Sequence, residues 1–136
     1  MTTKQVRYWL PPVIYTGLII LASSLPQGVV KEYSFELSDK LLHTMHYMVY
    51  GLTLIWAFLG SRSVSEGFKK AYLQAIGVGI LVGMLDEFYQ SFMPSRFSSG
   101  YDVLADSVGI LLAGLTFYYL MKIPVFERIR RHAKTA

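Results

Sequence analysis

Long runs of residues without formal charge limit what this chain can fold into. Tyr8–Val30 and Leu41–Ser61 contain no Asp, Glu, Lys or Arg, and each is long enough for the roughly 20 apolar residues with which a helix crosses a bilayer. Of the 136 residues, 53% are hydrophobic and only 16% are charged, which is too few charges for an ordinary soluble domain. The sequence therefore predicts an all-α integral membrane protein.

Two further spans are expected in the second half of the chain. The third begins near Ala71, but its uncharged run stops at Leu85, about five residues short of a full crossing. Asp86 and Glu87 are therefore expected inside the membrane zone, with Glu87 about 100° away from the side of the helix that carries Asp86. The chain is predicted to form one transmembrane domain, residues 1–136, a four-helix bundle with spans at 8–30, 39–61, 71–93 and 101–121 and a basic cytoplasmic tail at 122–136.

A polar stretch between the third and fourth spans carries the candidate site. Met84–Gly109 holds four of the nine acidic residues. On a helical wheel Asp86 and Gln90 share one face with small residues, and so do Asp102 and Asp106. Small residues permit close contact between helices, so both faces are expected to turn toward the interior of the bundle.

The second span carries polar side chains of its own. His43, Tyr47 and Tyr50 share one helical face, and His46 lies at the margin of that face. Side chains of this kind within a membrane helix have to face protein or water. The polar face of this helix is therefore expected to meet the acidic faces of the third and fourth helices.

Depth along the helices groups these residues further. At about 1.5 Å per residue, the polar residues of three helices fall into two layers below the membrane surface. The deeper layer holds His46, Asp86 and Asp106. The shallower layer holds His43, Gln90 and Asp102, with Arg96 above it as a lid. We expect one polar pocket at the extracytoplasmic side to collect them.

The distribution of basic residues predicts the orientation. Ten of the 13 Lys and Arg residues lie in the N-terminus, the Arg62–Lys70 connection and the C-terminal tail, whereas Lys31, Lys40 and Arg96 lie in the two opposite connections. Lys and Arg are enriched on the cytoplasmic side of membranes, so both termini are predicted to be cytoplasmic. Orientation also explains the net charge of +4, and no nucleic-acid partner is expected.

The N-terminal segment allows a second interpretation. Lys4 and Arg7 precede the first apolar run, and the run contains Ala22-Ser23-Ser24. This pattern also resembles a cleavable signal peptide. The first span is predicted as a transmembrane helix, and the signal peptide stays open as the alternative.

The chain resembles the VanZ-like family of membrane proteins, which is associated with teicoplanin resistance. The resemblance covers about residues 37 to 115, and it is carried by Asp39-Lys40, His43, Tyr47, Asp86-Glu87, Gln90, Phe92, Pro94, Arg96, Asp102 and Gly109. Asp106 departs from it, because family members more often have asparagine there, and a carboxylate changes both the charge and the hydrogen-bonding capacity of the position. The resemblance implies a multi-pass protein of the bacterial plasma or inner membrane, and it implies no settled reaction.

Three classes of function remain open. An enzyme would act on a lipid-linked or cell-wall-related anionic substrate, and its catalytic residues would be Asp86, His43, His46 and Asp106. The residues expected to bind that substrate are Arg96, Gln90, Glu87, Asp102, Tyr47 and Lys40. The alternatives are a noncatalytic binder of a membrane lipid or antibiotic and a small proton-coupled transporter, for which a homo-oligomer would supply a second half.

Structural roles compete with these functional ones. Asp102 follows Ser99 at the spacing of a helix-capping box, Gln90 has the chemistry to link helices, and a buried histidine is often a packed, hydrogen-bonded ring. The chain has no cysteine, and it has no HExxH or similar string of metal ligands. The sequence therefore assigns no metal site and leaves the cofactor unknown, although its histidines and carboxylates keep a metal-dependent variant open.

Overall fold

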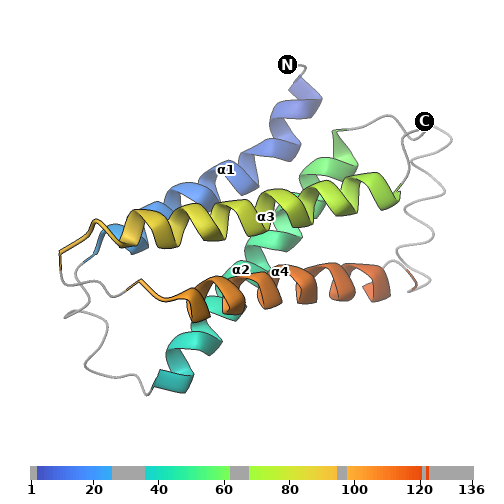
Figure 1. The fold of residues 1–136 in the computed structure, drawn as a ribbon. Coiled ribbons are helices and arrows are strands. Elements are labelled where there is room, and N and C mark those ends of the chain that lie inside the picture. The colour runs from blue at the N-terminus through green and yellow to red at the C-terminus, as the bar shows by residue number, and fades with distance from the viewer. Residues whose placement is uncertain (1–2, 26–35, 62–67, 95–97, 121, 123–136) are drawn as a thin grey trace, which may run out of the picture.

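Four helices follow the apolar runs of the sequence. The computed structural model describes residues 3–25, 36–61, 68–94, 98–120 and 122, and the predicted all-α class is confirmed within them. The helices are α1 (Thr3–Ser24), α2 (Glu36–Gly60), α3 (Phe68–Gln90) and α4 (Gly100–Leu120). The α1 helix begins before the predicted start at residue 8, and the predicted tail beyond Lys122 lies outside the described residues. Figure 1 shows that the ends of α1 and α3 lie on the same side of the molecule as the starts of α2 and α4.

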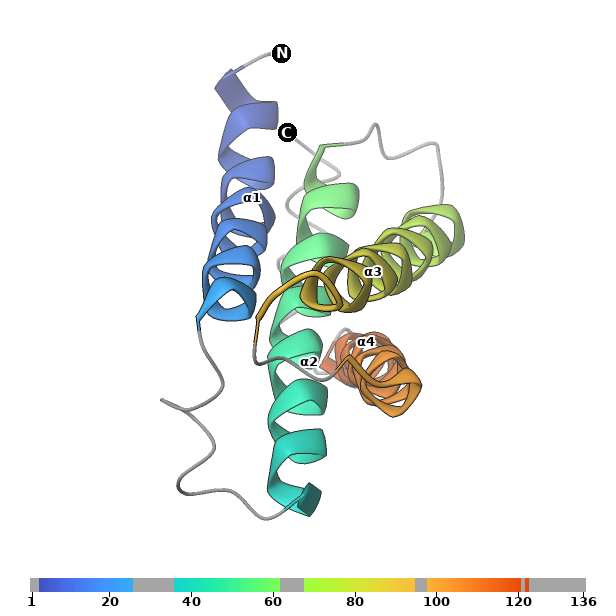
Figure 2. The same ribbon diagram turned by 60° about the vertical axis from the view of Figure 1, so that its left-hand side comes forward.

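Three helices are long and apolar enough to cross a membrane. They contain the segments Gln5–Ser24, Lys69–Gln90 and Gly100–Leu120. The α2 helix, where the sequence also predicted a span, is not among these three by length and composition, although Leu41–Ser61 carries no formal charge. It contacts all three other helices, α4 most extensively, and Figure 2 shows it between α1 and the pair of α3 and α4, which it crosses obliquely. The helix that carries His43 and His46 is therefore the central one.

Large apolar side chains cover the outside of the helices. Val13, Phe88 and Leu104 are each at least 60% exposed, whereas Leu54 of α2 and Ile110 of α4 belong to the buried core. In water such a surface would form unusually large apolar patches. In a bilayer it faces acyl chains, which agrees with the three membrane-capable helices.

Small residues allow α2 and α4 to pack closely. A Cβ atom at Gly109 would overlap the carbonyl oxygen of Thr44 and would lie 2.9 Å from the backbone nitrogen of Met48. One at Gly51 would lie 2.7 Å from Cβ of Ala113. Small residues at such positions allow backbones to approach closely. This contact fixes how far polar groups on α2 have to reach to meet those on α4.

Replacement of Gly109 by alanine is predicted to destabilise the fold. The added methyl group has to displace the α2 backbone, and overpacking of this kind costs about 1–3 kcal/mol. Gly77→Ala is the matched control, since a Cβ atom there meets nothing within 4 Å, and alanine is the better helix former. Thermal unfolding in detergent, followed by circular dichroism, should show a lower midpoint for Gly109→Ala than for Gly77→Ala. Equal midpoints would contradict the close α2–α4 packing.

Candidate functional site

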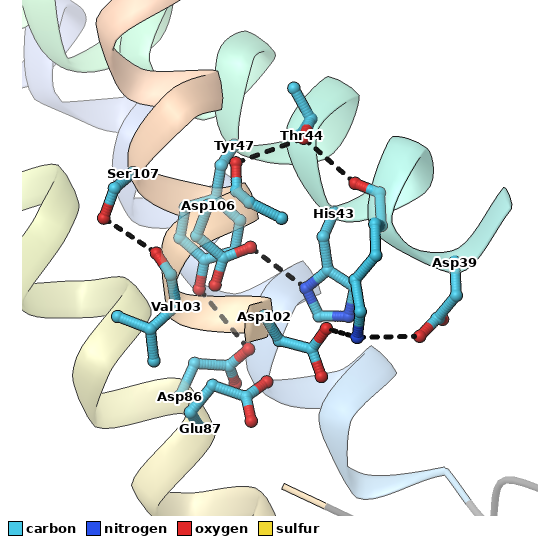
Figure 3. Close-up of polar contacts among 12 residues, drawn as sticks. Asp39, His43, Thr44, Tyr47, Asp86, Glu87, Asp102, Val103, Asp106 and Ser107 are labelled. Carbon is cyan, nitrogen blue, oxygen red and sulfur yellow. Dashed lines mark hydrogen bonds and ion pairs between the residues drawn. The ribbon is translucent and has the colours of Figure 1, made fainter. Parts of the chain in front are cut away.

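Polar side chains from all four helices meet where α1 and α3 end and α2 and α4 begin. We call this group the polar cluster, and its members are Ser23, Lys40, His43, Tyr47, Asp86, Glu87, Gln90, Ser99, Asp102 and Asp106. Its four carboxylates, on α3 and α4, are at most 7% exposed. Figure 3 shows these carboxylates gathered between α2, α3 and α4. The structure thus brings together the acidic groups that the sequence predicted to share one interior.

Asp86 links three helices. It accepts hydrogen bonds from the hydroxyl of Ser23 on α1 at 2.5 Å, from the hydroxyl of Tyr47 on α2 at 3.3 Å and from the side-chain amide of Gln90 at 3.0 Å. Gln90 also donates to the Ser23 hydroxyl oxygen at 3.1 Å. A buried carboxylate needs such donors, because its charge is otherwise strongly unfavourable away from water. Asp86 is therefore held in one orientation by donors on three sides.

Asp106 forms the second centre of the cluster. Its Oδ1 atom lies 3.0 Å from Nδ1 of His43 on α2. Gly83 of α3 makes room for it, since a Cβ atom there would come within 3.3 Å of both Asp106 and Tyr47. The Asp106 side chain is 1% exposed and that of His43 is 18% exposed. The pair thus joins a fully buried carboxylate to a histidine nearer the surface.

Lys40 supplies the cation at the edge of the cluster. Its ammonium group forms an ion pair with Asp102 of α4 and lies 3.7 Å from Asp39. Thr44, one turn further along α2, donates a hydrogen bond to the backbone oxygen of Ala105 at 3.2 Å. These contacts join the start of α2 to the start of α4, so the closely packed helix pair also carries complementary charges.

Glu87 is buried, although the helical wheel sets it about 100° away from the side of α3 that carries Asp86. Glu87 is 3% exposed, and its Oε2 accepts a hydrogen bond from the backbone nitrogen of Ser99 at 3.0 Å. The reason is that neighbouring helices cover two sides of α3. The side that carries Asp86 meets α1 and α2, and the side about 100° away meets the start of α4.

The capping box expected between Ser99 and Asp102 does not form, because Glu87 takes the place of Asp102 at the Ser99 nitrogen. The Ser99 hydroxyl does cap α4, because it accepts a hydrogen bond from the backbone nitrogen of Tyr101 at 3.2 Å. In a capping box the acid three residues later would bind the Ser99 nitrogen, but Glu87 of α3 takes that position. Asp102 is therefore available for Lys40.

His46 and Arg96 are not placed in the cluster. The His46 side chain is exposed, and its ring packs against Tyr15 of α1 with the ring centres 5.3 Å apart. The margin of the α2 face, where the helical wheel placed His46, thus faces α1, and His43 is the histidine that reaches the acids. Arg96, the predicted lid, lies outside the described residues.

Ser23 is a member of the polar cluster that was not among the predicted site residues. The sequence Ala22-Ser23-Ser24 allowed a signal-peptide cleavage site, whereas Ser23 is 3% exposed and donates a hydrogen bond to Asp86. A serine within an otherwise apolar membrane helix is a usual site of interhelical hydrogen bonding. That signal was present, but nothing in one sequence shows which helix receives the bond.

Two oxygens of the cluster lack partners. Oε1 of Glu87 and Oδ2 of Asp106 are buried and form no hydrogen bond with the part of the chain that the structure describes. Two groups of side chains have the spacing to hold a metal ion: His43, Glu87 and Asp106, and Asp39, His43 and Asp102. The polar cluster thus offers both proton-transfer and ion-binding chemistry.

Comparison with known proteins identifies one relationship. A family model described as VanZ/LLP1 matches residues 5–122, which confirms the resemblance found in the sequence and extends it over all four helices. Neither the curated proteins nor the solved structures yield a match.

Replacement of Ser23 by alanine is predicted to loosen the contact between α1 and α3. The change removes the hydroxyl that donates to Asp86 and accepts from Gln90. A buried polar group left without a hydrogen-bond partner lowers the free energy of unfolding by about 1–3 kcal/mol. Ser107→Ala is the matched control, since that hydroxyl donates a hydrogen bond to the backbone oxygen of Val103 within its own helix, at 2.7 Å. Unfolding in detergent should show a clear loss of stability for Ser23→Ala alone. Equal stabilities of the two variants would argue against the bond across the helices.

Proposed function

Since the chain belongs to the VanZ/LLP1 family, we propose that it is a multi-pass protein of the bacterial cell membrane that binds an anionic, lipid-linked or cell-wall-related substrate at the polar cluster and modifies its headgroup. The observation that carries this proposal is the pair of His43 and Asp106, 3.0 Å apart. A contribution to teicoplanin resistance, suggested by the family, is a further part of the proposal.

A histidine held by a buried carboxylate is chemically useful in two ways. The carboxylate fixes the tautomer and the orientation of the ring, and the ring then takes up a proton from a reacting group or binds a metal ion. Asp106 is 1% exposed, so water does not compete strongly for its bond to His43. Either role places the chemistry at His43.

Among the described residues, the cluster becomes more accessible toward the start of α2. The exposed fraction of the side chains rises from 18% at His43 through 30% at Lys40 to 44% at Asp39. A headgroup that approaches from this edge meets the ammonium group of Lys40 before it meets His43. Arg96 belongs to the chain segment between α3 and α4, and its planar guanidinium group suits phosphate or carboxylate.

Apolar surface beside this edge suits the hydrocarbon part of a substrate. Leu41 and Leu42, next to Lys40, are 58% and 55% exposed, and Phe88, next to Glu87, is 64% exposed. The rings of Phe88 and Phe92 pack edge to face with centres 4.9 Å apart. An amphiphile would leave its chain on such residues, in the lipid phase, while its headgroup reaches the polar cluster.

The proposal places the accessible edge outside the cell and both termini in the cytoplasm, in line with the distribution of basic residues. The chain has no cysteine, so single cysteines at Ser98 and Ser61 report without background. A membrane-impermeant maleimide is expected to label Ser98→Cys on intact cells and Ser61→Cys only after permeabilisation. The reverse labelling would overturn the orientation.

His43→Ala is predicted to stop the reaction without preventing binding. Protein in nanodiscs would be given a polyprenyl phosphate, with binding followed by native mass spectrometry and turnover by phosphate release and change of lipid mass. Loss of a catalytic histidine lowers rates about 10²-fold or more, whereas lipid binding should remain measurable because Lys40 and the lipid-facing surface are unchanged. His46→Ala should retain turnover, since His46 lies outside the cluster.

The outcomes separate the alternatives. Binding without turnover by the unmodified protein would identify a noncatalytic binder. Absence of binding would exclude lipid-linked phosphates as substrates. Equal loss of turnover in both histidine variants would show that the reaction does not centre on the pair of His43 and Asp106.

A further inference from the structure

Two buried carboxylates, those of Glu87 and Asp106, lie beside His43, and the ammonium group of Lys40, which interacts electrostatically with Glu87, is paired with Asp102. Glu87 is 3% exposed and Asp106 is 1% exposed, and each has an oxygen without a hydrogen-bond partner in the described part of the chain. An ionised carboxylate is tolerated at such a depth only with compensating charge or donors. The geometry therefore leaves a place for a positively charged ligand.

The spacing of the ligand atoms suits a metal ion. His43, Glu87 and Asp106 each offer one ligand atom, and these three atoms lie within 4.8 Å of one another. His43 Nδ1 and Asp106 Oδ1 are 3.0 Å apart. Two ligands that are each about 2.1 Å from one ion, at an angle of about 90–110°, lie about 2.9–3.4 Å from each other. The observed separation is compatible with a shared ion as well as with a hydrogen bond.

A second group with suitable spacing is already neutralised. Asp39, His43 and Asp102 also lie within 4.8 Å of one another, but Lys40 forms an ion pair with Asp102 and lies 3.7 Å from Asp39. Asp39 is also 44% exposed, so water solvates it. The ammonium group already neutralises these two carboxylates, and the group that contains Glu87 is the one left open.

We propose that His43, Glu87 and Asp106 bind one divalent transition-metal ion of the Zn²⁺ or Mn²⁺ class. A neutral imidazole and two carboxylates leave no net charge once a divalent ion is bound. One nitrogen ligand with two oxygens favours such an ion over Ca²⁺ or Mg²⁺, which prefer oxygen ligands alone. Three protein ligands also leave coordination positions for water or substrate.

This ion deepens the proposed function, on which its role toward a substrate rests. An anionic headgroup that moves past Lys40 would otherwise meet two carboxylates of its own sign. A bound divalent ion reverses that repulsion and gives the headgroup an oxygen-binding centre. His43 then acts as a ligand, and its loss removes the ion as well as the reaction.

Metal binding can be measured without any lipid substrate. Chelator-treated protein in detergent would be titrated with Co²⁺, followed by visible absorption, and with Mn²⁺, followed by electron paramagnetic resonance. We expect one ion per chain, and pulsed resonance of the Mn²⁺ form should show coupling to a histidine nitrogen. Binding should also raise the midpoint of thermal unfolding.

Three variants identify the ligands. Glu87→Gln and Asp106→Asn keep the side-chain shape and are expected to weaken metal affinity by more than about tenfold, since even the loss of outer groups costs 10- to 100-fold. Asp39→Asn, from the competing group, should bind as tightly as the unmodified protein. If the first two variants fail to fold, the nitrogen coupling of the unmodified protein still decides the matter.

The proposal is overturned if no metal ion binds at stoichiometric level, if a bound ion shows no nitrogen coupling, or if Asp39→Asn weakens binding while Glu87→Gln does not. The first result would mean that protons neutralise the two acids. Lipid turnover that persists in chelator-treated protein would refute the role of the metal ion in the reaction and leave the proposed function intact. Metal binding without any lipid binding would refute the proposed function and leave the site.

Discussion

Burial of four carboxylates in an apolar bundle is the constraint on which the rest of this structure depends. Charge in a medium of low dielectric is stable only when donors or opposite charges surround it. Asp86 accepts hydrogen bonds from Ser23 of α1 and Tyr47 of α2, and Asp102 forms an ion pair with Lys40 of α2. Each contact joins different helices, so the compensation of these charges also specifies how the helices pack.

The central position of α2 follows from the same constraint. It is the helix that falls short of a membrane-capable span, and its polar residues Lys40, His43 and Tyr47 are those that meet the acids of α3 and α4. Lipid would solvate these side chains poorly, whereas the other helices supply partners for them. The packing of the other three helices around α2 thus supplies partners for its polar side chains.

The fold class and most members of the site could be predicted from residue types and helical spacing. Runs without formal charge indicated the helices. Asp86 and Gln90 share one helical face, as do Asp102 and Asp106, and these faces indicated which sides of the helices turn toward the interior of the bundle. The errors concern relations between helices. The burial of Glu87, the exposure of His46 and the bond from Ser23 all depend on which neighbour covers which side of a helix, and the periodicity of one helix does not contain that information.

Glu87 uses its two carboxylate oxygens for different purposes. One accepts a hydrogen bond from the backbone nitrogen of Ser99, where α4 begins, and the other is buried and has no hydrogen-bond partner among the described residues. Whatever changes the charge of this side chain also changes the strength of its bond to the first turn of α4. Thermodynamic linkage makes the effect reciprocal: displacement of that turn alters the affinity of the interior for protons or ions. One glutamate therefore makes the conformation of a helix terminus and the charge state of the protein interior mutually dependent.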